Sequence, residues 1–122
     1  MKKKYFFFDI DGTLTDNATK KYVPSALEAL KLLQDNGHFV AIATGRAHYK
    51  ARPAMKDCGL HNMVCCGGGG LVINDELIVN TPLDIDKAKA IVLQAEENNI
   101  PILKSSREKQ VIEKNCAYIT EE

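Results

Sequence analysis

Two aspartates one residue apart, Asp9 and Asp11, follow the apolar run Tyr5-Phe6-Phe7-Phe8, and Gly12 comes directly after them. Two like charges at the end of a buried strand repel each other and must be desolvated, so a bound cation or a chemical role would explain the pair. Residues i and i+2 of an extended segment point the same way, and glycine lets the backbone turn close to a ligand. The pattern therefore indicates an active site, with an ordinary Asp-Gly surface turn as the alternative.

Two short motifs resemble those of a known family. The run Asp9-Ile10-Asp11-Gly12-Thr13-Leu14-Thr15 resembles motif I of the haloacid dehalogenase (HAD) superfamily of phosphatases and phosphomutases. Thr44-Gly45-Arg46 follows the apolar Phe39-Val40-Ala41-Ile42-Ala43 and resembles the second motif, in the form found in the Cof-type, type IIB-capped branch. Because the motifs occur in the right order and each follows a predicted strand, the chain is identified as a member of this superfamily.

The resemblance implies a magnesium-dependent phosphatase that works through an aspartyl-phosphate. Asp9 would be the nucleophile, and Asp11 would protonate the leaving alkoxide and then accept a proton from the attacking water. The Mg²⁺ ion, which prefers oxygen ligands, would be held by the Asp9 side chain and the Asp11 backbone carbonyl. Both aspartates are therefore predicted as catalytic residues and as metal ligands.

The second motif is expected to bind the phosphate group. The resemblance implies that the Thr44 hydroxyl and the Gly45 N–H contact phosphoryl oxygens at the start of a helix. Gly12 is expected to line the same site from the first motif. Arg46 is a further phosphate ligand in this interpretation, and its alternative is an ion pair with a surface carboxylate.

The order of apolar segments predicts an α/β fold with a parallel sheet, and the resemblance implies the Rossmann-like three-layer sandwich of a HAD core. A strand-helix-strand connection of this length predicts a right-handed crossover between parallel neighbours. Parallel strands end at the same edge of a sheet, so both motifs are expected to meet there. The predicted elements are a central strand at 5–10, a helix at 24–36, a strand at 38–43, a helix at 47–57 and a strand at 63–66.

The chain is expected to hold two parts. Residues 1–80 are predicted to form the amino-terminal part of a HAD core, with a hairpin at 71–80. Residues 81–122 resemble the start of an incomplete type IIB-like α/β cap, with a helix at 86–98, short strands at 100–103, 110–112 and 117–120, and a loop at 104–109. Complete relatives carry a later lysine and a Gly-Asp-x-x-x-Asp-like segment that have no counterpart here, so both an active and an inactive 122-residue chain are compatible with the resemblance.

Composition restricts the partners. Sixteen basic and sixteen acidic residues cancel, which argues against nucleic acid or an anionic membrane as a partner. No segment approaches the roughly 20 apolar residues of a membrane helix, and the cytoplasm is the expected location. The four cysteines, Cys58, Cys65, Cys66 and Cys116, form no Cys-x-x-Cys pair, so free thiols are favoured over a disulfide or a thiolate metal site.

Three functions fit these observations. The first is a magnesium-dependent phosphatase acting on a small phosphorylated metabolite, such as a sugar phosphate or a phosphorylated cofactor. The second is a phosphomutase of the same superfamily, and the third is a noncatalytic module or fragment that binds phosphate ligands or a complementary chain.

The glycine run Gly67–Gly70 is interpreted as a flexible turn, because it lacks the Lys-Ser/Thr of a P-loop. Self-association through an incomplete sheet or cap is also expected.

Overall fold

The structure is a computed structural model that describes the backbone of residues 2–102, 105–106, 109–110, 112–113 and 118–119, and the side chains of residues 2–102. The chain divides into two compact units, unit 1 at Met1–Asn80 and unit 2 at Thr81–Glu122. Both candidate motifs belong to unit 1. No helix within the described residues is long and apolar enough to cross a bilayer.

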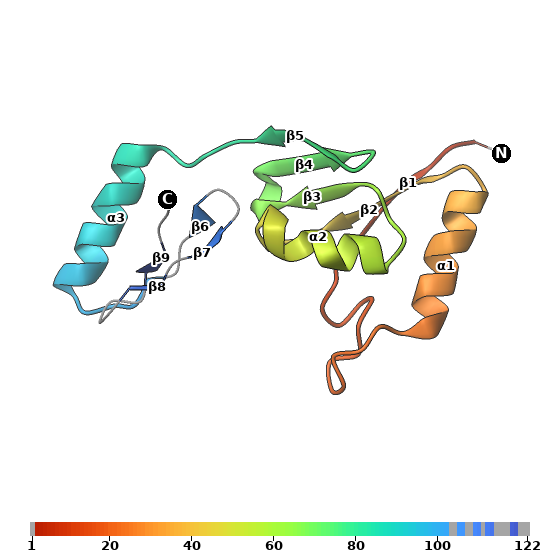
Figure 1. The fold of residues 1–122 in the computed structure, drawn as a ribbon, viewed down its shortest axis with the longest axis horizontal. Helices are drawn as coiled ribbons and strands as arrows, with labels where there is room; N and C mark the ends of the chain where they lie inside the picture. The colour runs from red at the N-terminus through yellow and green to blue at the C-terminus, as the bar shows by residue number, and fades with distance from the viewer. Residues whose placement is uncertain (1, 103–104, 107–108, 111, 114–117, 120–122) are drawn as a thin grey trace. The chain divides into compact units, whose positions relative to one another are not determined.

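Unit 1 contains a five-stranded sheet whose strands lie side by side in chain order (Figure 1). The first three strands are parallel neighbours, whereas β4 and β5 add to β3 as an antiparallel hairpin. The strands are β1 (Tyr5–Phe8), β2 (Phe39–Ala43), β3 (Met63–Cys65), β4 (Gly70–Ile73) and β5 (Glu76–Asn80). The predicted α/β fold class is confirmed, and the sheet is mixed because its last two strands return as a hairpin.

Two helices supply the crossovers between the parallel strands. Helix α1 (Pro24–Asp35) begins with a proline at its first turn, where the missing N–H costs nothing, and Gly37 follows its end with φ of +82°. Helix α2 (His48–Asp57) connects β2 to β3. Both match the predicted helices.

One hydrophobic core joins the two helices to one face of the sheet. Leu30 of α1 and Met55 of α2 are buried in the same cluster as Val40 and Ile42 of β2. Both helices therefore cover the same face. Unit 1 shows two of the three layers that the sequence predicts.

The prediction that the first strand is central and buried is wrong for the described residues. β1 is the edge strand of the sheet and pairs with β2 alone. Tyr5 and Phe7 are 63% and 54% exposed, whereas Phe6 and Phe8 are half-buried. The aromatic run resembles a doubly covered strand, but alternate rings lie on the face opposite the helices, where they contact Phe39 at ring-centroid distances of 5.3 and 5.9 Å.

The hairpin after β3 closes through a tight turn. Asn74 and Asp75 both have positive φ, 49° and 67°, as a type I′ hairpin turn requires, and both residue types tolerate that conformation. The predicted hairpin is therefore confirmed. The glycine run before it forms a short 3₁₀ turn, η1 (Cys66–Gly68), and its last glycine, Gly70, opens β4.

Unit 2 begins with helix α3 (Ile85–Glu97), close to the predicted bounds, and the Asp84 side chain accepts a hydrogen bond from the Lys87 N–H at its start. Residues 100–102 form no strand, contrary to prediction, and the loop predicted at 104–109 contains strand residues. Residues 103, 111, 117 and 120 of the predicted strands lie outside the described residues. The short strands are β6 (Ser105–Ser106), β7 (Lys109–Gln110), β8 (Ile112–Glu113) and β9 (Tyr118–Ile119).

Candidate active site

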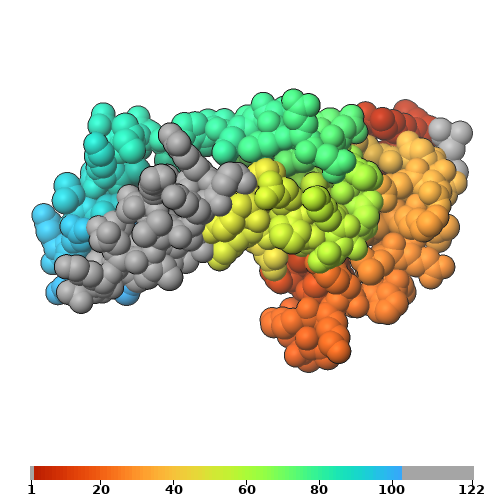
Figure 2. All heavy atoms as spheres, in the orientation of Figure 1, coloured from red at the N-terminus to blue at the C-terminus, as the bar shows by residue number. Residues whose placement is uncertain are grey.

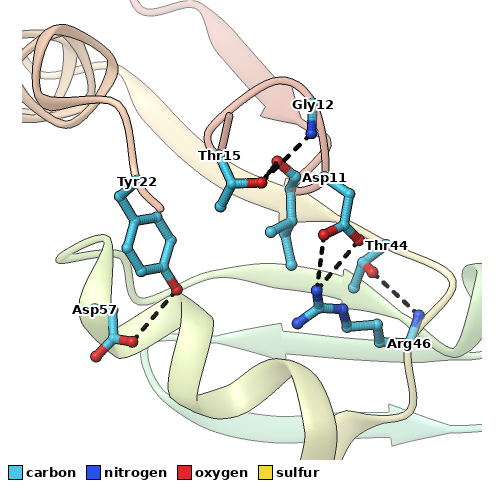
Figure 3. Close-up of polar contacts among 8 residues, drawn as sticks. Asp11, Gly12, Thr15, Tyr22, Thr44, Arg46 and Asp57 are labelled. Carbon is cyan, nitrogen blue, oxygen red and sulfur yellow. Dashed lines mark hydrogen bonds and ion pairs between the residues drawn. The ribbon is translucent and has the colours of Figure 1, made fainter. Parts of the chain in front are cut away.

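The carboxyl ends of β1 and β2 lie side by side and bring the two motifs together. Phe8 is in register with Ile42, so the residues that follow the two strands leave the same edge of the sheet. The Arg46 Nη2 atom lies 3.0 and 3.2 Å from the two carboxylate oxygens of Asp11 (Figure 3). The predicted meeting of the two strand ends is thus confirmed for these side chains.

The two aspartates lie on the solvent side of the first strand end. Asp9 and Asp11 are exposed, whereas Ile10 between them is 1% exposed and belongs to the core. This exposed-buried-exposed order is the alternation expected of an extended segment, although the strand itself ends at Phe8. Asp9 makes no ion pair with any described residue, so its carboxylate is open to a ligand.

The segment 9–15, which we call the acidic loop, is held by hydrogen bonds to one of its own carbonyl groups. The Ile10 oxygen accepts from the N–H groups of Thr13, Leu14 and Thr15 at 3.2, 2.9 and 3.1 Å. Leu14 is 2% exposed and packs in the core. The backbone of the loop therefore turns around the Ile10 carbonyl, which belongs to the residue between the two aspartates.

Thr15 is a structural residue of this loop to which sequence reasoning assigned no role. Its buried hydroxyl donates to the Ile10 oxygen at 3.3 Å and accepts from the Gly12 N–H at 3.4 Å (Figure 3). A hydroxyl can do both because it carries one donor and two acceptor sites. The signal that could have identified it is a threonine that ends the motif and is followed by a mostly polar segment.

Gly12 is required by the shape of the acidic loop. Its φ is +80°, and a Cβ at this position would lie 3.0 Å from the Asn17 side chain. Its N–H group is directed to the Thr15 hydroxyl. The structure therefore gives Gly12 a role in the turn, and its contact with phosphate stays a prediction.

The segment 44–47, which we call the second loop, is held by neighbouring strands. The Thr44 N–H donates to the Val64 oxygen at 2.9 Å, and its carbonyl accepts from the Gly67 N–H at 3.2 Å. The Arg46 carbonyl accepts from the Cys66 N–H at 2.7 Å. These bonds place the loop at the start of α2, where backbone N–H groups and the helix dipole favour an anion.

Within the second loop, a hydroxyl and a glycine are placed to contact a ligand. The Thr44 Oγ1 atom accepts a hydrogen bond from the Arg46 N–H at 3.1 Å, and its own proton stays available for donation to a phosphoryl oxygen. A Cβ at Gly45 would meet no protein atom within 4 Å. Packing inside the protein does not require a glycine there, whereas close approach of a ligand to the backbone would.

Arg46 joins the two loops through the Asp11 carboxylate. The two side chains are 38% and 61% exposed, so the ion pair contributes little to stability, about 0–1 kcal/mol. Only Nη2 of the guanidinium contacts Asp11, and the other N–H donors of the side chain remain for a second anion. The geometry shows the ion pair and leaves room for the phosphate contact.

Exposed residues 16–20 form a lobe beyond the acidic loop, coloured orange in Figure 2. Asp16 belongs to this lobe, and hydrogen bonds from the Thr19 and Ala18 N–H groups lower its pKa. This carboxylate therefore shapes the lobe. At the end of the lobe, the Tyr22 hydroxyl donates to Asp57 Oδ2 at 3.3 Å, and burial is the main cause that raises the Tyr22 pKa to about 12.

The donors at this edge fit a hard divalent cation only in part. The Asp9 carboxylate and the Asp11 carbonyl are oxygen donors of the kind that Mg²⁺ prefers. Among the described residues, however, no three His, Cys, Asp or Glu side chains are grouped to hold a metal ion. The residues present would thus supply part of a coordination shell, and water or phosphate oxygens would supply the rest.

The chain matches the model of one protein family over residues 6–122, and that family is described as haloacid dehalogenase-like hydrolase. The match covers nearly the whole chain and agrees with the fold and with both motifs. The chain belongs to the haloacid dehalogenase-like hydrolase family. The predicted superfamily is therefore confirmed.

Individual relatives support the same assignment. The protein YkrA of Bacillus subtilis (strain 168), a phosphatase by name, is 32% identical over 103 residues, which are 84% of this chain and 40% of YkrA. A hypothetical protein of Geobacillus kaustophilus HTA426 has 36% identity and a TM-score of 0.69, over 80% of this chain and 38% of that protein. The HAD subclass IIB sugar phosphatase BT4131 has 27% identity and a TM-score of 0.71, over 81% and 39%. The chain thus spans about two fifths of the length of these relatives.

Proposed function

We propose that this chain carries the nucleophile, the acid/base and part of the phosphate site of a magnesium-dependent phosphatase. The substrate would be a small phosphorylated metabolite, a sugar phosphate or a phosphorylated cofactor. The observation that carries the proposal is the contact of Arg46 with Asp11, which brings the acidic loop and the second loop to one edge of the sheet. Family membership and the phosphatases among the relatives support it.

The proposed reaction uses the two aspartates in turn. The exposed Asp9 carboxylate attacks phosphorus, the bond to the substrate oxygen breaks, and an aspartyl-phosphate forms on Asp9. Protonated Asp11 gives its proton to the leaving alkoxide and then takes a proton from the water that hydrolyses the aspartyl-phosphate. The Thr44 hydroxyl, the Gly45 N–H and the free donors of Arg46 would hold the phosphoryl oxygens during both steps.

A metal ion is needed because the nucleophile and the substrate are both anions. Mg²⁺ bound to the Asp9 side chain and the Asp11 carbonyl would offset phosphate charge. The acidic loop would fix the positions of these two oxygens, because its turn around the Ile10 carbonyl sets where each residue lies. The proposed enzyme is thus a magnesium-dependent phosphatase of the Cof-type branch.

The test compares phosphate release from p-nitrophenyl phosphate by the 122-residue chain and by the Asp9→Asn variant, with and without Mg²⁺. Asp9→Asn should lower the rate more than about 1,000-fold, because the amide is no nucleophile. Asp35→Asn is the matched control, since this carboxylate pairs with Lys31 on the surface of α1. Asp9→Asn with more than about a tenth of the parent rate would refute the assignment.

A second function is favoured by the incomplete metal shell. If the described residues supply only two metal-binding oxygens, the chain alone would bind phosphate without turning it over. Calorimetry with inorganic phosphate and Mg²⁺ would then show binding that Arg46→Gln weakens, while phosphate release stays at background. The phosphomutase alternative would transfer the phosphoryl group back to substrate, which product analysis would detect.

We also propose self-association through β1. This strand pairs only with β2 among the described strands, and its exposed rings form an apolar face with Phe39. An open strand edge beside exposed aromatic rings favours pairing with the same strand of a second copy. Light scattering over a concentration series should show a dimer that Phe7→Lys removes, whereas the exposed surface of α1 offers Leu32→Lys as a control.

A further inference from the structure

The lobe of residues 16–20 is a turn whose backbone is held by hydrogen bonds of its first residue. The Asp16 carboxylate accepts from the N–H groups of Ala18 and Thr19 at 2.8 and 3.0 Å, an arrangement with which aspartate commonly holds a turn. The Asp16 carbonyl accepts from the N–H group four residues later at 2.7 Å. Asn17 lies between these bonded groups, so the turn fixes where its side chain begins.

The Asn17 side chain is directed toward the acidic loop. A Cβ at Gly12 would lie 3.0 Å from the Nδ2 and Oδ1 atoms of Asn17 and 3.3 Å from its Cγ. Because the two polar atoms are nearer than the carbon that carries them, the amide end of the side chain points toward Gly12. The amide therefore lies close to the residue that directly follows Asp11, the acid/base of the proposed reaction.

The fold does not use this amide as a hydrogen-bonding group. Asn17 is exposed, and its side chain forms no hydrogen bond with any residue that the structure describes. The Gly12 N–H is bonded to the Thr15 hydroxyl instead. An asparagine amide has two N–H donors and a carbonyl oxygen with two acceptor sites. All of these can serve a molecule that binds beside the acidic loop.

We propose that Asn17 is a specificity-determining residue that hydrogen-bonds a hydroxyl group on the leaving group of the substrate. This inference rests on the proposed function, in which Asp11 protonates the leaving alkoxide and so places that part of the substrate near Gly12. A hydroxyl both donates and accepts, as an amide does, whereas a hydrocarbon leaving group offers the amide no partner. The site should therefore favour a sugar phosphate over a phosphate ester that lacks hydroxyl groups.

The experiment measures binding of three ligands by calorimetry with Mg²⁺: glucose 6-phosphate, ethyl phosphate and inorganic phosphate. The parent for this experiment is the 122-residue chain with Asp9→Asn, which cannot turn over either ester. Asn17→Ala should weaken binding of glucose 6-phosphate about 3- to 10-fold, the worth of one hydrogen bond. Affinity for the other two ligands should change less than about twofold. Asn36→Ala, at an exposed asparagine that ends α1, is the matched control and should change none of the three.

A second pair of variants tests the turn that holds Asn17. Asp16→Ala keeps the amide but removes the carboxylate that accepts two N–H groups, so the preference for glucose 6-phosphate over ethyl phosphate should also fall. Asp16→Asn keeps an acceptor oxygen and should restore most of the preference. Urea unfolding followed by circular dichroism should give Asn17→Ala the same midpoint as the parent.

Two results would overturn the role of Asn17 and leave the proposed function intact. One is an unchanged affinity of Asn17→Ala for glucose 6-phosphate, and the other is an equal weakening of all three ligands. A parent that binds no inorganic phosphate would instead remove the proposed function, and the role of Asn17 with it.

Discussion

The two loops that build the candidate site are held in different ways. The acidic loop is held by hydrogen bonds within its own residues. The Ile10 carbonyl accepts from three N–H groups between residues 13 and 15, and the Thr15 hydroxyl accepts from the Gly12 N–H and donates to the same carbonyl. The second loop depends on distant partners, since Val64, Cys66 and Gly67 fix its backbone from β3 and η1. The acidic loop therefore carries its shape in its own sequence, whereas the second loop takes its shape from the assembled sheet.

Of the substitutions that test this difference between the loops, Leu14→Ala should lower the free energy of unfolding the most. Leu14 is 2% exposed and is the part of the acidic loop that packs in the core. Removing three buried carbons and leaving a cavity should lower the free energy of unfolding by about 2–5 kcal/mol. Urea unfolding followed by circular dichroism measures it. A loss below about 1 kcal/mol would mean that the loop does not depend on its core contact.

Thr15→Val should cost about 1–3 kcal/mol in unfolding free energy, because the part-buried Gly12 N–H loses its acceptor, whereas the Ile10 oxygen keeps its three N–H donors. Thr44→Val removes one hydrogen bond from a half-buried residue, so about 0.5–1.5 kcal/mol is expected. Thr15→Ser keeps the hydroxyl and should recover most of the loss. Equal effects of the two valine variants would contradict the proposed difference between the loops.

Gly12 of the acidic loop and Gly45 of the second loop should respond differently to substitution by alanine. Gly12→Ala should destabilise the fold by about 1–2 kcal/mol, since φ is +80° and the new Cβ meets Asn17. Gly45→Ala should change stability by less than about 0.5 kcal/mol, because open space surrounds the position. The same alanine is expected to weaken phosphate binding in calorimetry. Stability loss at Gly45 equal to that at Gly12 would argue that Gly45 has a structural role.

Arg46→Gln should have little effect on stability, about 0–1 kcal/mol, since the ion pair with Asp11 is exposed and screened by salt. The expected change is in ligand binding, where one charged donor group is lost. Phosphate affinity should fall while the urea midpoint stays nearly constant. A large shift of the midpoint with unchanged affinity would assign Arg46 to the fold alone.

Much of the site could be predicted because the relevant information is local. The aspartate pair, its glycine and the hydroxyl-glycine step each follow an apolar strand, and two crossovers of ordinary length make those strands parallel. The positions of α1, α2 and the hairpin turn at Asn74–Asp75 also follow from their own residues. These elements required no knowledge of distant contacts.

The parts that were missed depend on contacts between distant residues. The edge position of β1 cannot be read from its four aromatic residues, because such a run suits either a covered strand or an edge whose rings contact each other. The choice of Asp11 as the partner of Arg46 depends on side-chain placement across 35 residues. The approach of the Cys65 and Cys66 side chains depends on the positive φ of Cys66, a conformation that cysteine rarely adopts and that no sequence motif indicates.

Helix α2 is joined directly to the second loop at its first residue and is linked to the acidic loop through Tyr22 at its last. Its first residue follows the second loop, and its last residue, Asp57, accepts the hydrogen bond of Tyr22, whose backbone bridges to Thr15. Each residue of an α-helix turns the chain by about 100°. A single inserted residue between the two ends would rotate Asp57 away from Tyr22 and break their hydrogen bond. The number of residues in this helix therefore fixes the direction in which its last residue points relative to the second loop.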